Sequence, residues 1–195
     1  STELEDSFQD RSSPLPPAPF FRVRSGYTEA SHRDLQRLNG FLKVLSEPQR
    51  DALRGQLRIG VHEEVQVTAT AWGEKPLREE QLVTQVFGSA CSVAYNRDSS
   101  KDDWQAFATL VLEASYEATL LAALKQAKKH QGQAGSRKVF LTCLGGGVFG
   151  NSMDWIAPAM RRACGQLRDF DLDVRIVTYA GSPSPELLRL EQEFS

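Results

Sequence analysis

The stretch KVFLTCLGGGVFGN, residues 138–151, decides the fold class because it places three consecutive glycines where a strand ends. Residues 138–144 are apolar enough for a buried β-strand. From Ser152 onward the sequence has the pattern of a helix with a polar cap and one apolar face. The sequence therefore predicts a strand-to-helix turn made largely of glycine.

A turn of this kind can bind an anion. The first backbone N–H groups of a helix have no partner within the helix, and the helix dipole adds to their positive potential. Gly145, Gly146 and Gly147 can adopt positive φ, so successive amides can curve into a concave nest around phosphate oxygens. Phe149 could close over a ribose or base attached to that phosphate. The alternative is that the glycines only make a tight connection, and the sequence leaves both interpretations open.

Two familiar phosphate-binding loops fit this run poorly. A Walker loop ends in Gly-Lys-Ser/Thr, whereas this one ends in Gly150-Asn151-Ser152. The spacing of Gly145, Gly147 and Gly150 matches GxGxxG, but that fingerprint needs a following strand that ends in an acidic ribose anchor. The next predicted strand, residues 173–179, does not supply one. The dinucleotide interpretation is therefore weak.

Composition limits the class of protein and of partner. The chain has 195 residues, of which 41% are hydrophobic and 25% charged, as expected for one globular domain. A net charge of −2 and a pI near 6.0 give no general attraction to DNA or anionic lipid. No apolar run approaches the roughly 18 residues of a membrane helix, so we expect a cytoplasmic or nuclear protein without membrane contact.

Cysteine and histidine positions predict neither a disulfide framework nor a metal site. The three cysteines, Cys91, Cys143 and Cys164, are far apart and include no CxxC pair. The His, Cys, Asp and Glu positions show no recognisable metal-ligand spacing. We expect no metal and no cofactor, and we interpret Cys143 as a core residue of its strand.

The first 19 residues contain SSPLPPAP and are predicted to be a flexible leader, followed by one domain over residues 20–195. Helices are predicted from Ser31 and over residues 47–54, and alternation predicts a strand over residues 57–68. The apolar residues of that strand are expected to share one face: Leu57, Ile59, Val61, Val65 and Val67. From Leu82 onward the predicted order is strand, helix, strand, helix, strand, which favours an α/β fold with helical crossovers.

The run VFLTCLGGGVFGN and the order of elements around it resemble the second phosphate-binding loop of macrodomains, a family that binds ADP-ribose and often removes it from proteins. The resemblance is clearest over residues 82–180. LRIGVHEEVQVT, VAYN and LVLEASYEATLLAAL are similar to a branch that includes effectors acting on ADP-ribosylated ubiquitin, which extends the match to about Phe20. The resemblance implies a three-layer α/β/α fold with a mixed sheet.

The resemblance also implies a site and an activity. The residues it assigns to the diphosphate of ADP-ribose are Gly145, Gly146, Gly147, Val148, Phe149, Gly150 and Asn151. Glu64 stands near the position of an acidic residue of the effector-like branch and is the catalytic candidate for hydrolysis of an ADP-ribosyl bond. The implied partner is ADP-ribose or an ADP-ribosylated protein such as ubiquitin. Two alternatives are a reader that binds without turnover and an inactive fragment that needs another chain to complete its sheet.

The chain departs from the macrodomain pattern at the first loop, whose asparagines and separate glycine cluster are not found before Leu57. Either the chain is the C-terminal half of a longer fold or its first loop has diverged, and both put catalysis in doubt.

Further polar and aromatic residues have two interpretations each. Glu113 and Glu117 lie on one helix face and form either an acid–base pair or, more often, salt bridges. His62 is interpreted as a surface residue rather than a substrate contact, and Tyr179 as packing rather than a base contact. Asn151 either caps the following helix or bonds to a ligand.

Overall fold

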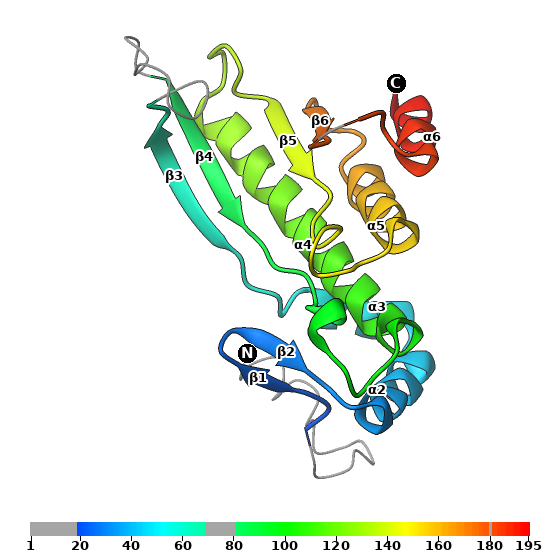
Figure 1. Cartoon of the computed structure of the whole chain (residues 1–195). Coiled ribbons are helices and arrows are strands. Elements are labelled where there is room, and N and C mark those ends of the chain that lie inside the picture. The colour runs from blue at the N-terminus through cyan, green and yellow to red at the C-terminus, as the bar shows by residue number, and fades with distance from the viewer. Residues whose placement is uncertain (1–18, 69–80, 180) are drawn as a thin grey trace.

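The computed structural model describes residues 19–68, 81–179 and 181–195 and has a mixed α/β architecture (Figure 1). The predicted α/β class is confirmed. The predicted leader, residues 1–19, lies almost wholly outside the described residues. In chain order the elements are β1 (Arg22–Arg24), β2 (Tyr27–Glu29), α2 (His32–Val44), α3 (Glu47–Arg54), β3 (Gly60–Gln66), β4 (Leu82–Phe87), η1 (Val93–Tyr95), α4 (Lys101–Lys129), β5 (Lys138–Thr142), α5 (Met153–Gln166), β6 (Asp173–Val177) and α6 (Pro185–Phe194).

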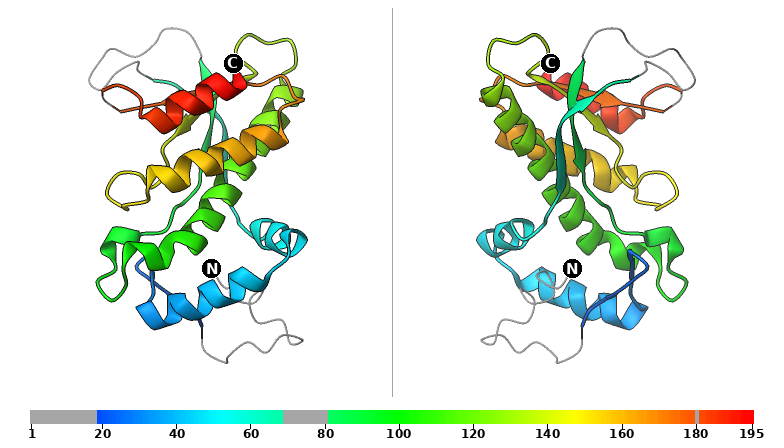
Figure 2. Two further views of the ribbon diagram at one scale, coloured as in Figure 1. Left: turned by 90° about the vertical axis from the view of Figure 1, so that its right-hand side faces the viewer. Right: turned by 90° about the vertical axis from the view of Figure 1, so that its left-hand side faces the viewer.

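The strands of the described part of the chain hydrogen-bond only in pairs. β1 pairs with β2 and β3 with β4, both antiparallel, whereas β5 and β6 are parallel, with Val139 opposite Val174. The parallel pair confirms the predicted helical crossover, because α5 joins its two strands. The single mixed sheet predicted for a three-layer fold is not formed by these residues. Instead, α4 lies between the β3–β4 hairpin and α5 (Figure 2).

Helix α4 is the centre of the core. Its many Ala and Leu residues favour helix, and a capping box begins it. The Ser100 hydroxyl accepts a hydrogen bond from the Asp103 amide, and the Asp103 carboxylate accepts one from the Ser100 amide. Trp104, Leu112 and Leu120 on this helix are fully buried. α4 packs against α5, α2 and α3, so it connects both ends of the molecule.

By length and hydropathy alone α4 is also apolar enough to cross a membrane, whereas the sequence analysis predicted no such segment. That prediction considered only unbroken apolar runs, and Glu113 and Glu117 interrupt the apolar residues of α4. Core helices of globular folds pass the same test, and the packing of α4 against three other helices accounts for its apolar composition.

The two helices before β3 follow the predicted bounds. α2 buries Leu35, Leu38 and Leu42, the leucines whose spacing predicted it. α3 begins after Ser46, which forms a capping box with Gln49. These local signals are sufficient because each helix buries one narrow apolar face.

Strand β3 contains a bulge that its sequence pattern does not reveal. Val61 lies opposite Val86, but Val65 lies opposite Val83, so two residues of β3 face one residue of β4 between these pairs. Residues 83 and 86 point to opposite faces of β4, and therefore Val61 and Val65 do too. Glu64 has a φ of 57°, the left-handed conformation found at some bulges. The prediction of one shared apolar face is wrong for this reason.

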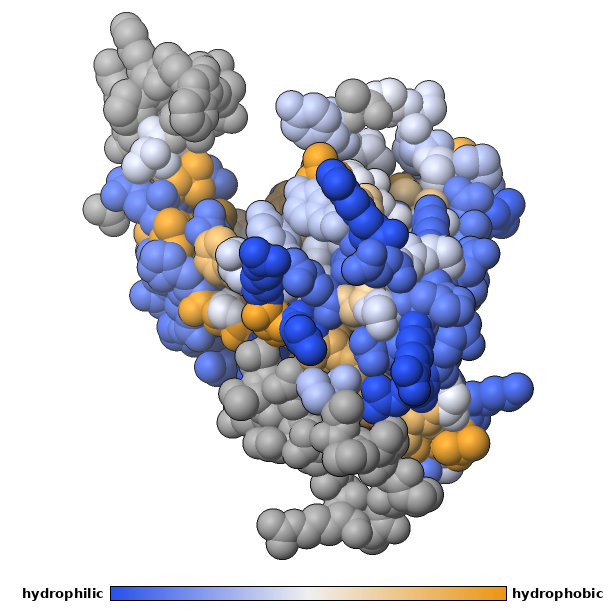
Figure 3. Space-filling model, turned by 60° about the horizontal axis from the view of Figure 1, so that its bottom comes forward, coloured by the Kyte–Doolittle hydropathy of each residue, from blue (hydrophilic) through white to orange (hydrophobic). Residues whose placement is uncertain are grey.

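Apolar side chains remain exposed on the strands. They gather over the β3–β4 hairpin, at the left of Figure 3. Leu82 is 53% exposed and Phe87 60% exposed, and Phe140 on β5 is 61% exposed. β4 and β5 also each have a second edge that bonds to no described strand. Because a two-stranded pair is marginally stable on its own, these strands depend on packing against the helices.

Candidate functional site

The glycine turn connects the end of β5 to the start of α5. Gly145 has a φ of 72° and Gly150 a φ of 75°, whereas Gly146 and Gly147 are outside the left-handed region. The prediction of positive φ is therefore confirmed for Gly145 alone among the three consecutive glycines.

Two glycines of the turn are required by packing. A Cβ on Gly145 would lie 2.5 Å from the Ala90 Cβ, and a Cβ on Gly150 would lie 3.0 Å from the Ala94 Cβ. Both neighbours belong to the segment of residues 88–96 that follows β4. The Ala94 amide also donates to the Phe149 carbonyl over 3.0 Å. The tight-connection interpretation therefore explains Gly145 and Gly150.

The middle of the turn is different. A Cβ on Gly147 would meet nothing within 4 Å in the described structure, and Val148 is 75% exposed. The amides of Gly146, Gly150 and Asn151 donate to carbonyls of the turn itself. Among the described residues no acceptor faces the amides of Gly147, Val148 and Phe149. The turn therefore has three consecutive backbone donors without a protein acceptor in the described structure, at two exposed residues and the half-buried Phe149.

These donors precede a helix start that no side chain caps. Ser152 is the N-cap of α5, but its hydroxyl makes no capping hydrogen bond. The first-turn amides of the helix and the amides of Gly147–Phe149 therefore contribute positive potential to the same region. Asp154, which is exposed in the first turn, is the acidic residue there.

Asn151 does not cap α5, because Ser152 is the N-cap of that helix. Its side chain is 4% exposed, and its Nδ2 donates to the Cys91 carbonyl at 2.8 Å and to the Gly145 carbonyl at 3.2 Å. Asn151 therefore ties the turn to residues 88–96. Its Oδ1 is buried and has no hydrogen-bond partner among the described residues.

Tyr116 supports the turn from the other side, and sequence reasoning did not find it. Its hydroxyl donates to the Thr142 carbonyl and accepts from the Leu144 amide, both at 2.8 Å. Burial raises the pKa of Tyr116 well above its usual value, so the hydroxyl keeps its proton. The end of β5 is thus held to α4 by a neutral side chain.

An aromatic cluster borders the open face of the turn. The Phe149 ring packs edge-to-face on Tyr27 and Tyr95, with ring centroids 6.1 Å and 5.5 Å away, and the two tyrosines lie 5.1 Å apart. Tyr27 is 42% exposed and Tyr95 49% exposed. Phe149 was predicted at this site from the sequence, whereas the two tyrosines were not. Tyr95 lies in the VAYN segment, but its position gave no signal of contact with a turn 50 residues later.

The structure does not bring Glu64 to the turn. Its carboxylate pairs with Lys129 at 2.8 Å, and this hydrogen bond lowers the pKa of Glu64 below its usual value. Lys129 lies 13 residues after Tyr116 on α4, which corresponds to about 20 Å along a helix. Figure 1 accordingly shows the end of β3 beside the C-terminal end of α4, whereas the loop between β5 and α5 lies beside the middle of that helix. Glu64 therefore forms a surface ion pair at the bulge, away from the candidate ligand residues.

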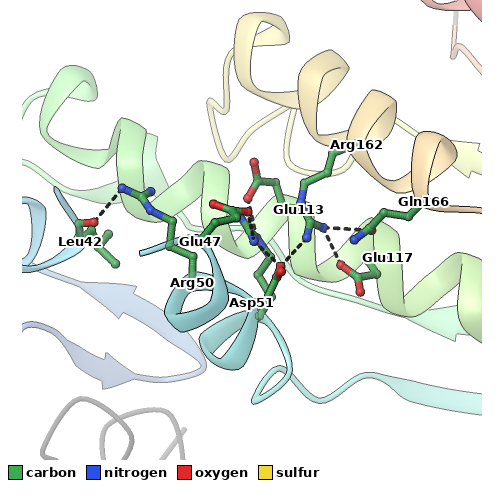
Figure 4. Close-up of polar contacts among 9 residues, drawn as sticks. Leu42, Glu47, Arg50, Asp51, Glu113, Glu117, Arg162 and Gln166 are labelled. Atoms are coloured by element: carbon green, nitrogen blue, oxygen red, sulfur yellow. Dashed lines mark hydrogen bonds and ion pairs between the residues drawn. The ribbon is translucent and has the colours of Figure 1, made fainter. Parts of the chain in front are cut away.

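The other carboxylates singled out on α4 form salt bridges. Glu113 accepts from Arg54 at 2.8 Å and Glu117 accepts from Arg162 at 2.5 Å, and Asp51 contacts both arginines (Figure 4). Burial alone would lower the pKa of Arg54, but the surrounding carboxylates raise it above its usual value. This network fastens α3 to α4 and α5, as the salt-bridge interpretation predicted.

The remaining candidates are not gathered at the turn. His62 is exposed on β3. Cys143 is half-buried, and burial raises the pKa of its thiol, which suppresses reactivity. Tyr179 is fully exposed, so the packing interpretation of this residue is wrong. Within the described ranges no group of three or more His, Cys, Asp or Glu side chains is placed to hold a metal ion.

Comparisons of the chain with protein-family models, with curated proteins and with solved structures found no match.

Proposed function

We propose that the chain binds ADP-ribose, free or attached to a protein such as ubiquitin, through the amides of Gly147, Val148 and Phe149. The observation that carries the proposal is that these three consecutive amides donate no hydrogen bond to a described residue, and that Gly147 and Val148 are exposed and Phe149 is half-buried just before α5. Backbone donors at a helix start suit a diphosphate, because they supply positive potential without basic side chains. The resemblance of the turn to the macrodomain loop favours ADP-ribose among diphosphates.

The proposal is narrower than the site that the resemblance implies. Gly145 and Gly150 are explained by packing, and the Asn151 side chain is buried between two segments. In this proposal the diphosphate contacts residues 147–149, and the other predicted site residues shape the turn. Phe149 contributes both its amide and its ring, so the ligand's ribose or base would lie against the aromatic cluster.

We propose binding without hydrolysis. Hydrolysis of an ADP-ribosyl bond needs a carboxylate near the distal ribose to activate water or stabilise charge. Glu64 is paired with Lys129 at the C-terminal end of α4, about 20 Å along the helix from Tyr116, which supports the turn. The separation of Glu64 from the turn therefore favours a reader of ADP-ribose over a hydrolase.

Isothermal titration calorimetry with ADP-ribose tests the proposal. Gly147→Asp places a carboxylate beside the three amides at a position where a side chain meets nothing within 4 Å. We expect ADP-ribose to bind the wild-type protein and this variant to bind at least about tenfold more weakly, because like charges oppose each other. Gly40→Asp is the matched control, since Gly40 is exposed on α2 with open space around it.

Failure of wild-type protein to bind ADP-ribose would refute the proposal, as would equal binding by Gly147→Asp. A second assay separates reader from hydrolase. ADP-ribosylated ubiquitin incubated with excess protein should keep its modification, and release of ADP-ribose would overturn the claim of binding without turnover.

A further inference from the structure

We infer that the N-terminal β1–β2 hairpin is a wall of the ligand site and that Tyr27 is the residue that selects ligands carrying an aromatic base. This inference rests on the proposed function, because it assumes that a nucleotide binds at residues 147–149. Tyr27 lies 122 residues before Phe149, and only the fold brings the two rings together.

The hairpin holds Tyr27 in a defined place. Ser25 has a φ of 50° and Gly26 a φ of 83°, the two positive values of a tight two-residue hairpin turn. Tyr27 is the first residue after this turn and pairs with Arg24 across the hairpin. Its ring position is therefore set by the turn rather than by a flexible loop.

The hairpin is hydrogen-bonded to residues 88–96, the segment that also contacts the glycine turn. On the hairpin side, the Ser92 hydroxyl and the Asn96 side chain both donate to the Thr28 carbonyl, at 3.0 Å and 3.1 Å. The Asn96 carbonyl oxygen Oδ1 accepts from the Ala30 amide at 3.1 Å. Ser92 is buried, whereas Thr28 and Asn96 are half-buried.

On the other side, residues 88–96 contact the glycine turn. Ala94 donates to the Phe149 carbonyl, and Asn151 donates to the Cys91 carbonyl. The segment thus lies between the hairpin and the turn and binds both. This arrangement sets the position of Tyr27 relative to the amides of Gly147–Phe149.

The packing of the three rings indicates the class of ligand. Their centroids are 5.1–6.1 Å apart with interplanar angles of 70–81°, so the rings contact one another and enclose no space for a methylated ammonium group. Exposed ring surface remains on both tyrosines. A flat aromatic base can stack on such a surface, and this contact typically contributes about 1–3 kcal/mol per base.

Two probes separate the base contact from the phosphate contact. We expect Tyr27→Ala to weaken binding of ADP-ribose at least about fivefold, the lower end for loss of one stacked ring, and to leave binding of inorganic pyrophosphate unchanged. Tyr27→Phe keeps the ring and should bind ADP-ribose as the wild type does. Val23→Ala is the control, because Val23 is 46% exposed on the same hairpin and has no place in the aromatic cluster.

The outcomes are distinguishable by calorimetry with thermal unfolding of each variant alongside. Wild-type binding of ADP-ribose with equal binding by Tyr27→Ala overturns this inference and leaves the proposed function standing. The inference is also overturned if a folded Tyr27→Ala variant binds ADP-ribose and pyrophosphate equally more weakly than the wild type. Tyr27 would then affect the shape of the turn rather than contact the base. Absence of ADP-ribose binding by the wild type refutes the proposed function and this inference together.

Discussion

Replacing Gly145 by alanine is expected to destabilise the fold by about 2–5 kcal/mol. A Cβ at this position would lie 2.5 Å from the Ala90 Cβ and 2.6 Å from the Asn151 Nδ2. The left-handed backbone alone costs an L-residue with a Cβ about 1–2 kcal/mol. Forcing a methyl group into a filled contact costs about 1–3 kcal/mol more. Relief is difficult, because Ala90 is buried and Asn151 is held by two hydrogen bonds.

Gly147→Ala is the matched control for this prediction. Gly147 has no positive φ, and its added Cβ would meet nothing within 4 Å in the described structure. Thermal unfolding followed by circular dichroism measures the difference. For a chain of this size each kcal/mol lowers the melting temperature by about 2–4 °C. The expected losses are about 4–20 °C for Gly145→Ala and less than about 2 °C for Gly147→Ala.

Equal melting temperatures for the two variants would refute the conclusion that Gly145 is required by packing and that Gly147 is not. The same pair also tests function. If Gly147→Ala melts like the wild type but binds ADP-ribose more weakly, the loss of affinity arises at the turn surface, because the fold is intact.

Four further predictions concern residues outside the turn. Arg54→Ala should lower the free energy of unfolding by about 2 kcal/mol in urea titrations, because Glu113 and Glu47 lose the cation they pair with. Solvation of the exposed Glu47 reduces the cost, and Asp51 keeps its ion pair with Arg162. Burial alone would raise the pKa of Asp103, but hydrogen bonds from neighbouring groups lower it well below its usual value. The ionised Asp103 therefore stabilises the folded protein fully at pH values above its pKa in the unfolded chain, about 3.9. The difference in melting temperature between the wild type and Asp103→Asn should shrink as the pH falls below that value. Glu64→Gln should leave the affinity for ADP-ribose unchanged in calorimetry, and a large loss of affinity would show that Glu64 belongs to the binding site. Sedimentation velocity should show concentration-dependent association that Phe140→Lys reduces, because this ring is exposed beside a strand edge that bonds to no described strand.

The helices and the parallel pair could be predicted from the sequence because their signals are local. Ser46 followed by Pro48 marks the start of α3, and the alanines and leucines of α4 favour helix; the cap of α4 was expected at Asp102 or Asp103, whereas the structure has Ser100 there. The bulge in β3 could not be predicted in this way. It depends on the register against β4, and the alternation of apolar residues continues through Glu64 as if the strand were regular.

In the candidate site, too, local features could be predicted from the sequence and tertiary contacts could not. The glycine turn and Phe149 were predictable, because a strand, glycines and a helix follow one another directly in the sequence. Tyr27 and Tyr116 were not, since each reaches the turn only through tertiary packing. The role of Asn151 was missed because local reasoning considers helix caps first, whereas its side chain crosses to the Cys91 carbonyl.

The supports of the turn also bear on how a ligand would bind. Tyr116 holds its start, Asn151 holds its end, and the Ala94 amide holds the Phe149 carbonyl between them. These contacts come from α4 and from residues 88–96, so they do not require a continuous sheet under the turn. A turn fixed on both sides loses little conformational entropy when it binds, and this preorganisation favours affinity for a small anionic ligand. The edges of β4 and β5 that bond to no described strand are therefore not among the contacts that support the proposed ADP-ribose site.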